Sequence, residues 1–210
     1  QPGASGRRAS PEILQCRIER RDGEEWVVLH DRDTTPLIKV EALPSTFGGA
    51  ARFNLENALA AISAAWLVGV PPDGIREAMG KFDMSFQNTP GRLNHYAGLP
   101  YQAFIDFAHN PDGIKRLTEF AARLPVKGRR LLLLAGPGDR SDELIAGMAR
   151  SAGTVFDHIV CRSYPNLRGR ARGEVPDLLA STLRAGGVAD ANITIEPHPE
   201  RAVATILTMA

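Results

Sequence analysis

Cysteine is scarce in this sequence, and the two cysteines present exclude two kinds of site. Cys16 and Cys161 lie far apart in a chain of 210 residues, with no Cys-x-x-Cys spacing and no paired histidines. Neither a zinc site nor a disulfide framework is therefore expected. The chain also has no apolar run near the ~20 residues that cross a bilayer, and its first residues lack the apolar centre of a signal peptide. We expect a cytoplasmic protein with no metal site of its own and no membrane partner.

A large excess of charge of one sign is also missing. The formal net charge is +1 at pH 7, so the bulk electrostatics do not require nucleic acid or a membrane surface. Residues 162–172 are rich in arginine, but only Tyr164 supplies an aromatic ring nearby, whereas nucleic-acid binding favours rings interleaved with the charges. We expect no nucleic-acid partner. An anionic small molecule or polypeptide is the better candidate, and a plain solvated loop is the alternative.

Two glycine-rich nucleotide motifs are absent or incomplete. No Gly-x-x-x-x-Gly-Lys-Ser/Thr segment occurs, so the phosphate-cradling P-loop is missing. The segment LLLLAGPGDRS at residues 131–141 fails the dinucleotide fingerprint, because Ser141 replaces the third glycine and Pro137 stiffens the turn. NAD binding is therefore disfavoured. We expect Arg140 to present a cation to a phosphate or carboxylate; the alternative is that Asp139 caps the next helix and Arg140 is solvated.

The apolar patterns that are present predict an α/β protein with two regions. Residues 1–88 contain strands at 13–20, 26–30 and 37–40 and helices at 53–68 and 75–82. The polar segment at 85–91 marks the boundary. Beyond it a strand pair (92–96, 101–107) precedes strands at 130–135, 156–162 and 193–196, alternating with helices at 111–124, 141–152, 173–185 and 199–209. Strands separated by single helices predict a parallel sheet.

The segment IDFAHNPDG at residues 105–113 runs from an apolar strand into a polar turn and a helix. It places the side chains of Asp106, His109 and Asn110 at one strand end, where open α/β sheets bind ligands, and His109 is a candidate for proton transfer there. The alternatives are that Asp106 and Asn110 only cap the helix and that His109 is a structural or positioning group. Upstream, Arg92 follows a Pro-Gly turn and can reach a phosphate when two domains close; the alternative is a weak surface ion pair.

Three segments together resemble a known family: FNLENALAA at 53–61, Pro90-Gly91-Arg92, and DFAHNP at 106–111. Their order and spacing resemble the Mur-ligase superfamily of ATP-dependent amide-bond ligases, from about Ile13 to the end. The resemblance implies that residues 1–88 are the C-terminal portion of the central ATPase domain, a small α+β remnant. Residues 89–210 would be the C-terminal domain, with a Rossmann-like, mostly parallel sheet and flanking helices. Within the superfamily, GDR at 138–140 with LRGR at 167–170 is most similar to cyanophycin synthetases.

The resemblance also implies roles for single residues. Asn57 would contact adenine, Arg92 the nucleotide phosphates and Asp106 the ribose hydroxyls. His109 and Asn110 would line the same crevice. The residues expected to face the incoming amino acid or the growing acceptor are Asp139, Arg140, Arg168 and Arg170.

In such ligases ATP phosphorylates a carboxylate and an amine attacks the acyl phosphate, so ATP and Mg²⁺ are the implied cofactors. The implied partners are an amino acid and an anionic peptide or polymer acceptor, as when Asp and Arg are added to a poly-Asp chain. Because the P-loop, the modified lysine and the magnesium ligands of the central domain are missing and Gln1 replaces an initiator Met, we expect a fragment that is inactive alone.

Two departures leave the substrate open. Phe107 stands where the family usually has Tyr, and residues 161–166 lack the acidic residues expected of a cyanophycin synthetase. The alternative function is a non-catalytic Mur-type module whose basic loops hold an anionic peptide or a partner protein. The sequence leaves the formation of a homo-oligomer open.

Overall fold

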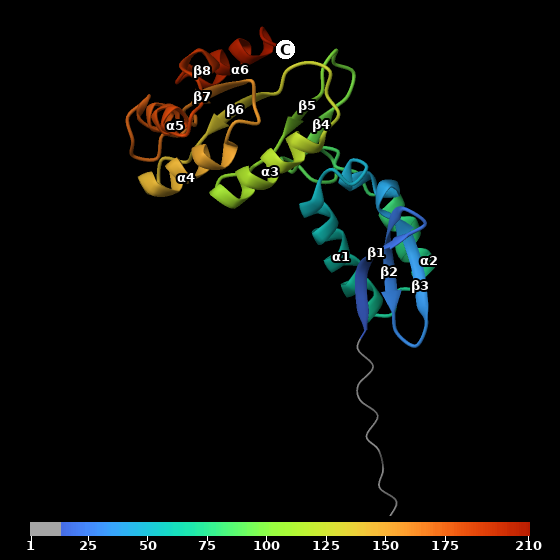
Figure 1. Cartoon of the computed structure of the whole chain (residues 1–210). Coiled ribbons are helices and arrows are strands. Elements are labelled where there is room, and N and C mark those ends of the chain that lie inside the picture. The colour runs from blue at the N-terminus through green and yellow to red at the C-terminus, as the bar shows by residue number, and fades with distance from the viewer. Residues whose placement is uncertain (1–13) are drawn as a thin grey trace, which may run out of the picture. The chain divides into compact units, whose positions relative to one another are not determined.

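The computed structural model describes residues 14–210, and they form two compact units, the first ending at Met84 and the second beginning at Ser85 (Figure 1). The predicted boundary, between residues 88 and 89, lies slightly later in the same polar segment. The start of the first predicted strand, at Ile13, lies outside the described residues.

The first unit is a three-stranded antiparallel sheet with two helices. The strands are β1 (Gln15–Arg21), β2 (Glu24–His30) and β3 (Thr34–Lys39), in the order β1-β2-β3. Two short 3₁₀ turns, η1 (Val40–Ala42) and η2 (Pro44–Thr46), lead to α1 (Arg52–Leu67) and α2 (Pro72–Lys81). Asp22 and Gly23 both have positive φ, 51° and 85°, as the tight turn of a two-residue hairpin requires. The core consists of Val27, Leu29, Leu37, Ile38, Val40, Leu43, Leu55, Ala58, Ile62 and Ile75.

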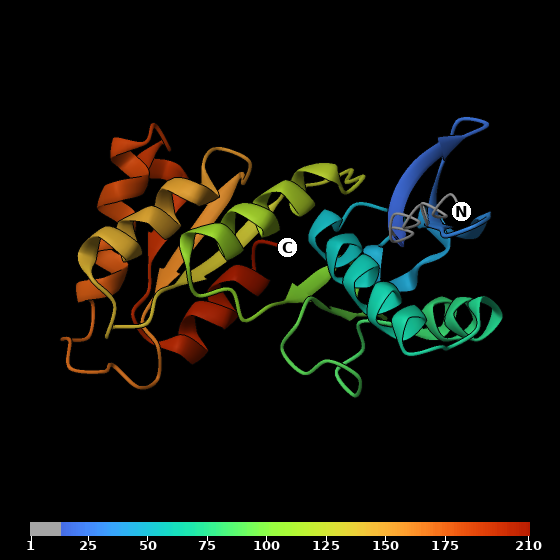
Figure 2. The ribbon, with the colours of Figure 1, turned by 90° about the horizontal axis from the view of Figure 1, so that it is seen from below.

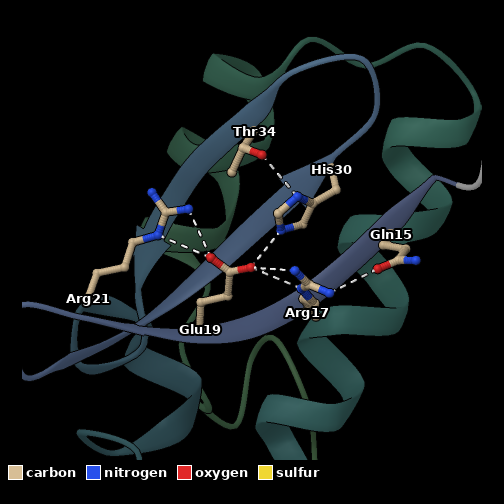
Figure 3. Close-up of polar contacts among 6 residues, drawn as sticks. All are labelled: Gln15, Arg17, Glu19, Arg21, His30 and Thr34. Carbon is tan, nitrogen blue, oxygen red and sulfur yellow. Dashed lines mark hydrogen bonds and ion pairs between the residues drawn. The ribbon is translucent and has the colours of Figure 1, made fainter.

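Basic side chains surround the carboxylate of Glu19, a residue of β1 (Figure 3). Its carboxylate accepts hydrogen bonds from Arg21 at 2.9 Å and from Arg17 at 2.8 Å. The ring nitrogen Nε2 of His30 lies 2.7 Å from the same carboxylate, and Nδ1 lies 3.0 Å from Oγ1 of Thr34. Hydrogen bonds from Arg21, then Arg17 and His30, lower the pKa of Glu19 to about 2.

This cluster predicts an acid-sensitive component of stability in the first unit. Because the pKa of folded Glu19 lies below its ordinary value of 4.5, its contribution is present above about pH 4.5 and is lost as the pH falls toward about 2. Glu19→Gln should flatten the fall in the free energy of unfolding across this window. Urea unfolding followed by tryptophan fluorescence measures the free energy of unfolding of the first unit selectively, since Trp26 and Trp66 both lie in that unit. Glu41→Gln is the control; an unchanged acid limb in Glu19→Gln contradicts the prediction.

The second unit contains the predicted parallel sheet. It begins with a pair of short strands, β4 (Asn94–Tyr96) and β5 (Ala103–Ile105), and continues through α3 (Pro111–Arg123). Strand and helix then alternate: β6 (Leu131–Ala135), α4 (Asp142–Ala152), β7 (His158–Arg162), α5 (Glu174–Ala185), the turn η3 (Asp190–Asn192), β8 (Ile193–Ile195) and α6 (Pro199–Leu207). The sheet order β6-β7-β8 is parallel throughout. The α/β fold class and the flanking helices are confirmed.

The helices cover both faces of this sheet. The connections from β6 to β7 and from β7 to β8 cross the sheet in the same direction, and crossovers between parallel strands are right-handed. The helices in these connections, α4 and α5, therefore cover the same face. Figure 1 shows α6 on the opposite side from α4, and α6 contacts β6 and β7. The core holds large apolar residues of the sheet and of α3, α4 and α5, among them Ile114, Leu134, Ile145, Met148, Ile159, Leu179 and Leu183.

The strand pair predicted at 92–96 and 101–107 is confirmed with shorter strands, since β4 and β5 pair antiparallel with each other. The expectation that the strand before Asp106 belongs to the open parallel sheet is wrong, because β4 and β5 form a ladder separate from β6-β7-β8. Leu93 has a φ of 47°, which a strand cannot accommodate. After Ile105 the carboxylate of Asp106 takes up backbone N–H groups that a continuing ladder would use. The strand end that carries Asp106 is therefore not an edge of the parallel sheet.

Close packing of α3 on α4 anchors this strand end instead (Figure 2). A Cβ on Gly147 of α4 would lie 2.8 Å from the ring of Pro111, the first residue of α3. Ala108 packs against the core of the parallel sheet, and Phe104 of β5 meets Phe120 of α3 edge to face at 5.1 Å. The turn between β5 and α3 is therefore held in place by packing against α4 and the core of the parallel sheet. No helix among residues 14–210 has the length and apolar content to cross a membrane.

Candidate functional site

The turn that carries Arg92 is fixed by a network of backbone and side-chain bonds. The N–H of Arg92 donates to the carbonyl of Thr89 at 3.0 Å, closing a turn around Pro90 and Gly91, and Gly91 has a φ of 71°. Pro before a glycine of positive φ suits a type II turn. Asn94, only 1% exposed, accepts from the N–H of Gly91 at 2.7 Å and donates to the carbonyl of Thr89 at 2.9 Å. The Arg92 backbone is therefore held in place.

Asp106 ties this turn to the strand end. Its Oδ2 accepts from the N–H of Leu93 at 2.8 Å, and its Oδ1 accepts from the N–H of Ala108 at 2.7 Å. The N–H of Phe107 also donates to the carbonyl of Gly91 at 2.8 Å. Each carboxylate oxygen keeps a lone pair beyond the bond it makes here, so the group can still accept hydroxyl protons of a ligand.

Arg92 and His109 flank an exposed aromatic ring. The Arg92 guanidinium carbon lies 5.5 Å from the centre of the Phe107 ring, and the His109 ring lies 5.1 Å from it on a tilted plane. Phe107 is 54% exposed. Nδ1 of His109 lies 3.0 Å from the Phe107 carbonyl, so a backbone contact orients the imidazole. Three of the predicted site residues, Arg92, Asp106 and His109, thus lie on two adjoining turns that hydrogen bonds hold together.

Asn110 caps the helix as the alternative expected, whereas Asp106 does not. Asn110 precedes α3 and its Oδ1 accepts from the N–H of Gly113 at 2.7 Å, which is an N-cap. Asp106 bonds Leu93 and Ala108 and caps no helix. Asn110 remains exposed at the start of α3, where the positive end of the helix dipole favours an anionic ligand.

Asn57 belongs to the first unit and lies on α1. It is exposed, and its Nδ2 donates to Oδ1 of Asn54 at 3.5 Å. Asn54 is buried and donates to the carbonyl of Ser45 at 2.7 Å. Of these two asparagines, Asn54 has a structural role and Asn57 offers its amide to solvent.

A second group of predicted residues meets where β6 and β7 end. The loop after β6 and the loop after β7 touch at Gly138, whose Cβ, if present, would overlap the carbonyl oxygen of Leu167. The glycine therefore allows two protein backbones to approach each other closely.

Two arginines fasten these loops together. Nη1 of Arg168 donates to both carboxylate oxygens of Asp139, at 3.1 and 2.9 Å. Burial opposes ionisation of Asp139, but the hydrogen bond and charge of Arg168 outweigh it and lower the pKa of that carboxyl. Arg170 donates to the carbonyl oxygens of Gly138 and Arg140, both at 2.8 Å. The helix α4 is capped by Ser141 through the N–H of Leu144, so Asp139 is not its cap.

Arg170 also binds two carboxylates, Asp142 at 2.7 Å and Glu174 at 2.8 Å. Arg140 is exposed, and its side chain makes no hydrogen bond or ion pair with another residue in the described part of the chain. The four predicted residues of this group are therefore brought together: Arg168 and Arg170 link the two loops, Asp139 is the carboxylate partner of Arg168, and Arg140 faces solvent. Within residues 14–210 no group of three or more His, Cys, Asp or Glu could hold a metal ion.

Sequence reasoning missed two positioning residues. Asn94 supports the Arg92 turn, and the buried Ser163 accepts from the N–H of Gly173 at 3.3 Å, which closes the loop after β7. An asparagine shortly after a Pro-Gly turn is a usable signal, because its side chain can bond back to the turn. Ser163 has no comparable local signal, since its partner lies at the far end of the loop.

Comparison with known proteins gives a consistent result. Residues 91–210 match the family model described as "Mur ligase, glutamate ligase domain". The cyanophycin synthetase of Crocosphaera subtropica is 40% identical over 167 residues, which cover 76% of this chain and 19% of that protein. A UDP-N-acetylmuramoyl-L-alanyl-D-glutamate--2,6-diaminopimelate ligase of Gloeobacter violaceus is 30% identical over 161 residues, covering 76% of this chain and 31% of that protein. The chain thus spans about a fifth to a third of these relatives.

Among solved structures, folylpolyglutamate synthase of Mycobacterium tuberculosis complexed with ADP aligns with a TM-score of 0.65 and 21% identity. The alignment covers 92% of this chain and 39% of that chain. At this identity the likeness shows the fold alone.

Proposed function

The chain belongs to the Mur ligase family, and we propose that it is the C-terminal part of an ATP-dependent ligase that forms an amide bond through an acyl phosphate. The chain spans about a fifth of the cyanophycin synthetases that it matches. A cyanophycin-like reaction, in which amino acids are added to an anionic polymer, is the specific form that we propose. ATP and Mg²⁺ are its proposed cofactors, and the amino acid and the acceptor are its proposed substrates.

The observation that carries the proposal is the coupling of Arg92 to Asp106. Arg92 carries a charged guanidinium suited to phosphate, and Asp106 carries a carboxylate with free lone pairs. The hydrogen bond from the N–H of Leu93 to Asp106 holds the two residues on adjoining turns. Arg92 is exposed and its backbone is pinned by Thr89 and Asn94. A preorganised cation costs little reorganisation when it meets phosphate. We propose that Arg92 contacts the phosphates and Asp106 the ribose, with His109 and Asn110 nearby and Asn57 of the first unit at the adenine.

A non-catalytic binding module remains the second candidate, and the exposed basic side chain of Arg140 favours it. The two candidates differ upstream: a P-loop in the coding sequence before this chain supports the ligase, and its absence from the natural protein overturns it. The P-loop is needed because its backbone N–H groups and lysine cradle the phosphates.

The direct test is ADP release by the natural full-length protein with ATP, Mg²⁺ and a carboxylate acceptor, compared with and without amino acid. Arg92→Ala should reduce amino-acid-dependent ADP release at least about tenfold, because a charge-assisted bond to phosphate is lost. Arg92→Lys should recover part of the amino-acid-dependent ADP release, because lysine keeps the positive charge but lacks the forked pair of N–H donors. Arg123→Ala, on the exposed side of α3, is the matched control.

Two results would contradict the proposal. The first is ADP release by the 210-residue chain alone, which has no P-loop. The second is full-length protein that releases no ADP with any amino acid tested.

A further inference from the structure

Phe107 carries an aromatic ring that the proposed function does not use. The residue is 54% exposed, whereas its neighbours Asp106 and Ala108 are partly buried. A single exposed apolar side chain is common on protein surfaces and by itself indicates no function. The contacts of this ring, however, involve a residue of the proposed nucleotide site.

The ring of Phe107 lies against the side chain of Arg92. The guanidinium carbon of Arg92 is 5.5 Å from the ring centre, within the roughly 6 Å over which the face of a ring attracts a cation. Among residues 14–210 the Arg92 side chain forms no hydrogen bond or ion pair. Within this part of the chain, the ring is therefore the one close partner of the Arg92 charge.

An aromatic ring holds an arginine differently from a carboxylate or a carbonyl group. Arg168 donates from Nη1 to both carboxylate oxygens of Asp139, and Arg170 donates to two backbone carbonyl oxygens. The N–H groups used in these bonds are occupied. A ring attracts the charge of the guanidinium and leaves its in-plane N–H donors free. Arg92 therefore keeps its forked donors available for a phosphate.

The backbone that carries the ring is bonded to the turn that carries Arg92. The N–H of Phe107 donates to the carbonyl of Gly91 at 2.8 Å, so the two side chains start from segments that a hydrogen bond joins. The imidazole of His109 also lies 5.1 Å from the ring centre on a tilted plane. Its Nδ1 lies 3.0 Å from the Phe107 carbonyl. The ring is therefore restrained through its own backbone and by a neighbouring side chain.

We propose that Phe107 is a positioning residue for Arg92: its ring restrains the guanidinium and leaves the N–H donors free for the phosphates of a nucleotide. Phe107 acts through Arg92 and needs no contact of its own with the nucleotide. The inference rests on the proposed function for the phosphate contact. The restraint of the Arg92 side chain belongs to this chain alone and is measurable without ATP.

The first test measures that restraint in the 210-residue chain by nuclear magnetic relaxation of arginine Nε–H groups. Phe107→Leu should lower the order parameter of the Arg92 Nε–H group, because leucine is apolar but has no π-system to attract the cation. Phe107→Tyr keeps the ring and should restore the order parameter. Arg130, whose Nε donates to the carbonyl of Ala121 at 2.9 Å, is the internal reference and should not change.

The second test is a double-mutant cycle on amino-acid-dependent ADP release by the natural full-length protein. Phe107→Leu should lower kcat/KM for ATP about two- to fivefold, the factor that corresponds to an exposed cation–π contact of ~0.5–1 kcal/mol. In an Arg92→Ala background the same substitution should have no further effect, because the cation is already absent. Phe107→Tyr should recover most of the loss.

Phe86→Leu is the matched control in the second test. Phe86 is 62% exposed in the same unit, and among residues 14–210 no cation lies over its ring. Its replacement removes an exposed ring of the same size without removing a partner of Arg92. ADP release by Phe86→Leu should therefore stay unchanged.

Three outcomes would overturn the inference: an unchanged Arg92 order parameter in Phe107→Leu, equal losses of ADP release in Phe107→Leu and Phe107→Tyr, or an undiminished effect of Phe107→Leu in the Arg92→Ala background. The proposed function fails separately. An order parameter that falls in Phe107→Leu, with no ADP release by the full-length protein with any amino acid, would remove the ligase and leave the restraint standing. Amino-acid-dependent ADP release with an unchanged order parameter would do the reverse.

Discussion

In the natural full-length protein, Asp106→Ala is expected to reduce the proposed nucleotide-dependent ligation about a hundredfold and to loosen the turn that presents Arg92. One carboxylate serves the N–H groups of Leu93 and Ala108, at 2.8 and 2.7 Å. Leu93 is fully buried with a φ of 47°, a conformation that costs of order 1–3 kcal/mol and persists only when its surroundings hold it. Loss of the carboxylate leaves the two partly buried N–H donors of Leu93 and Ala108 unpaired, at up to about 1–3 kcal/mol each.

Two measurements separate the structural role of Asp106 from its proposed nucleotide role. Amide hydrogen exchange should show reduced protection at Leu93 and Ala108 in Asp106→Ala. Asp106→Asn should restore protection at one of the two sites only, because the amide has a single acceptor oxygen. If ADP release in both variants falls only in proportion to the folded fraction, the carboxylate has a structural role alone and the ribose contact is wrong.

Gly138→Ala is expected to lower the stability of the second unit by about 1–3 kcal/mol or more. The added methyl group would overlap the backbone carbonyl of Leu167, so the two loops would have to separate. Separation would also break the bonds that Arg170 makes to the carbonyl oxygens of Gly138 and Arg140. Thermal unfolding followed by far-ultraviolet circular dichroism should show a midpoint several degrees lower.

Gly128→Ala is the matched control. A Cβ at Gly128 would meet nothing within 4 Å, and Gly128 is not among the glycines of positive φ. This variant should be neutral or slightly stabilising, since alanine restricts the unfolded chain. Equal effects of the two substitutions would contradict the close approach at Gly138. A normal melting temperature for Gly138→Ala would do the same.

Much of the fold could be read from local patterns. The polar Asp22-Gly23 turn marks the first hairpin, and the alternation of apolar strands with amphipathic helices after residue 130 predicts β6 to β8 with bounds close to those observed. Asn110 before Pro111 is a local capping signal that the structure reproduces. The sequence by itself therefore determined the order and type of the elements, because helix, strand and cap signals depend on neighbours a few residues apart.

The tertiary structure alone decided how the predicted site residues are used. Asp106 meets an N–H 13 residues away, Arg168 meets a carboxylate 29 residues away, and Arg170 meets a carbonyl 32 residues away. It also separated the β4-β5 pair, which the sequence predicts, from the ladder of β6-β7-β8. No local pattern contains these pairings, since they depend on which loops the packing of α3, α4 and the sheet brings together. The physical reason is that a polar group removed from water needs a hydrogen-bond partner. Which partner lies within reach depends on how the loops pack against each other.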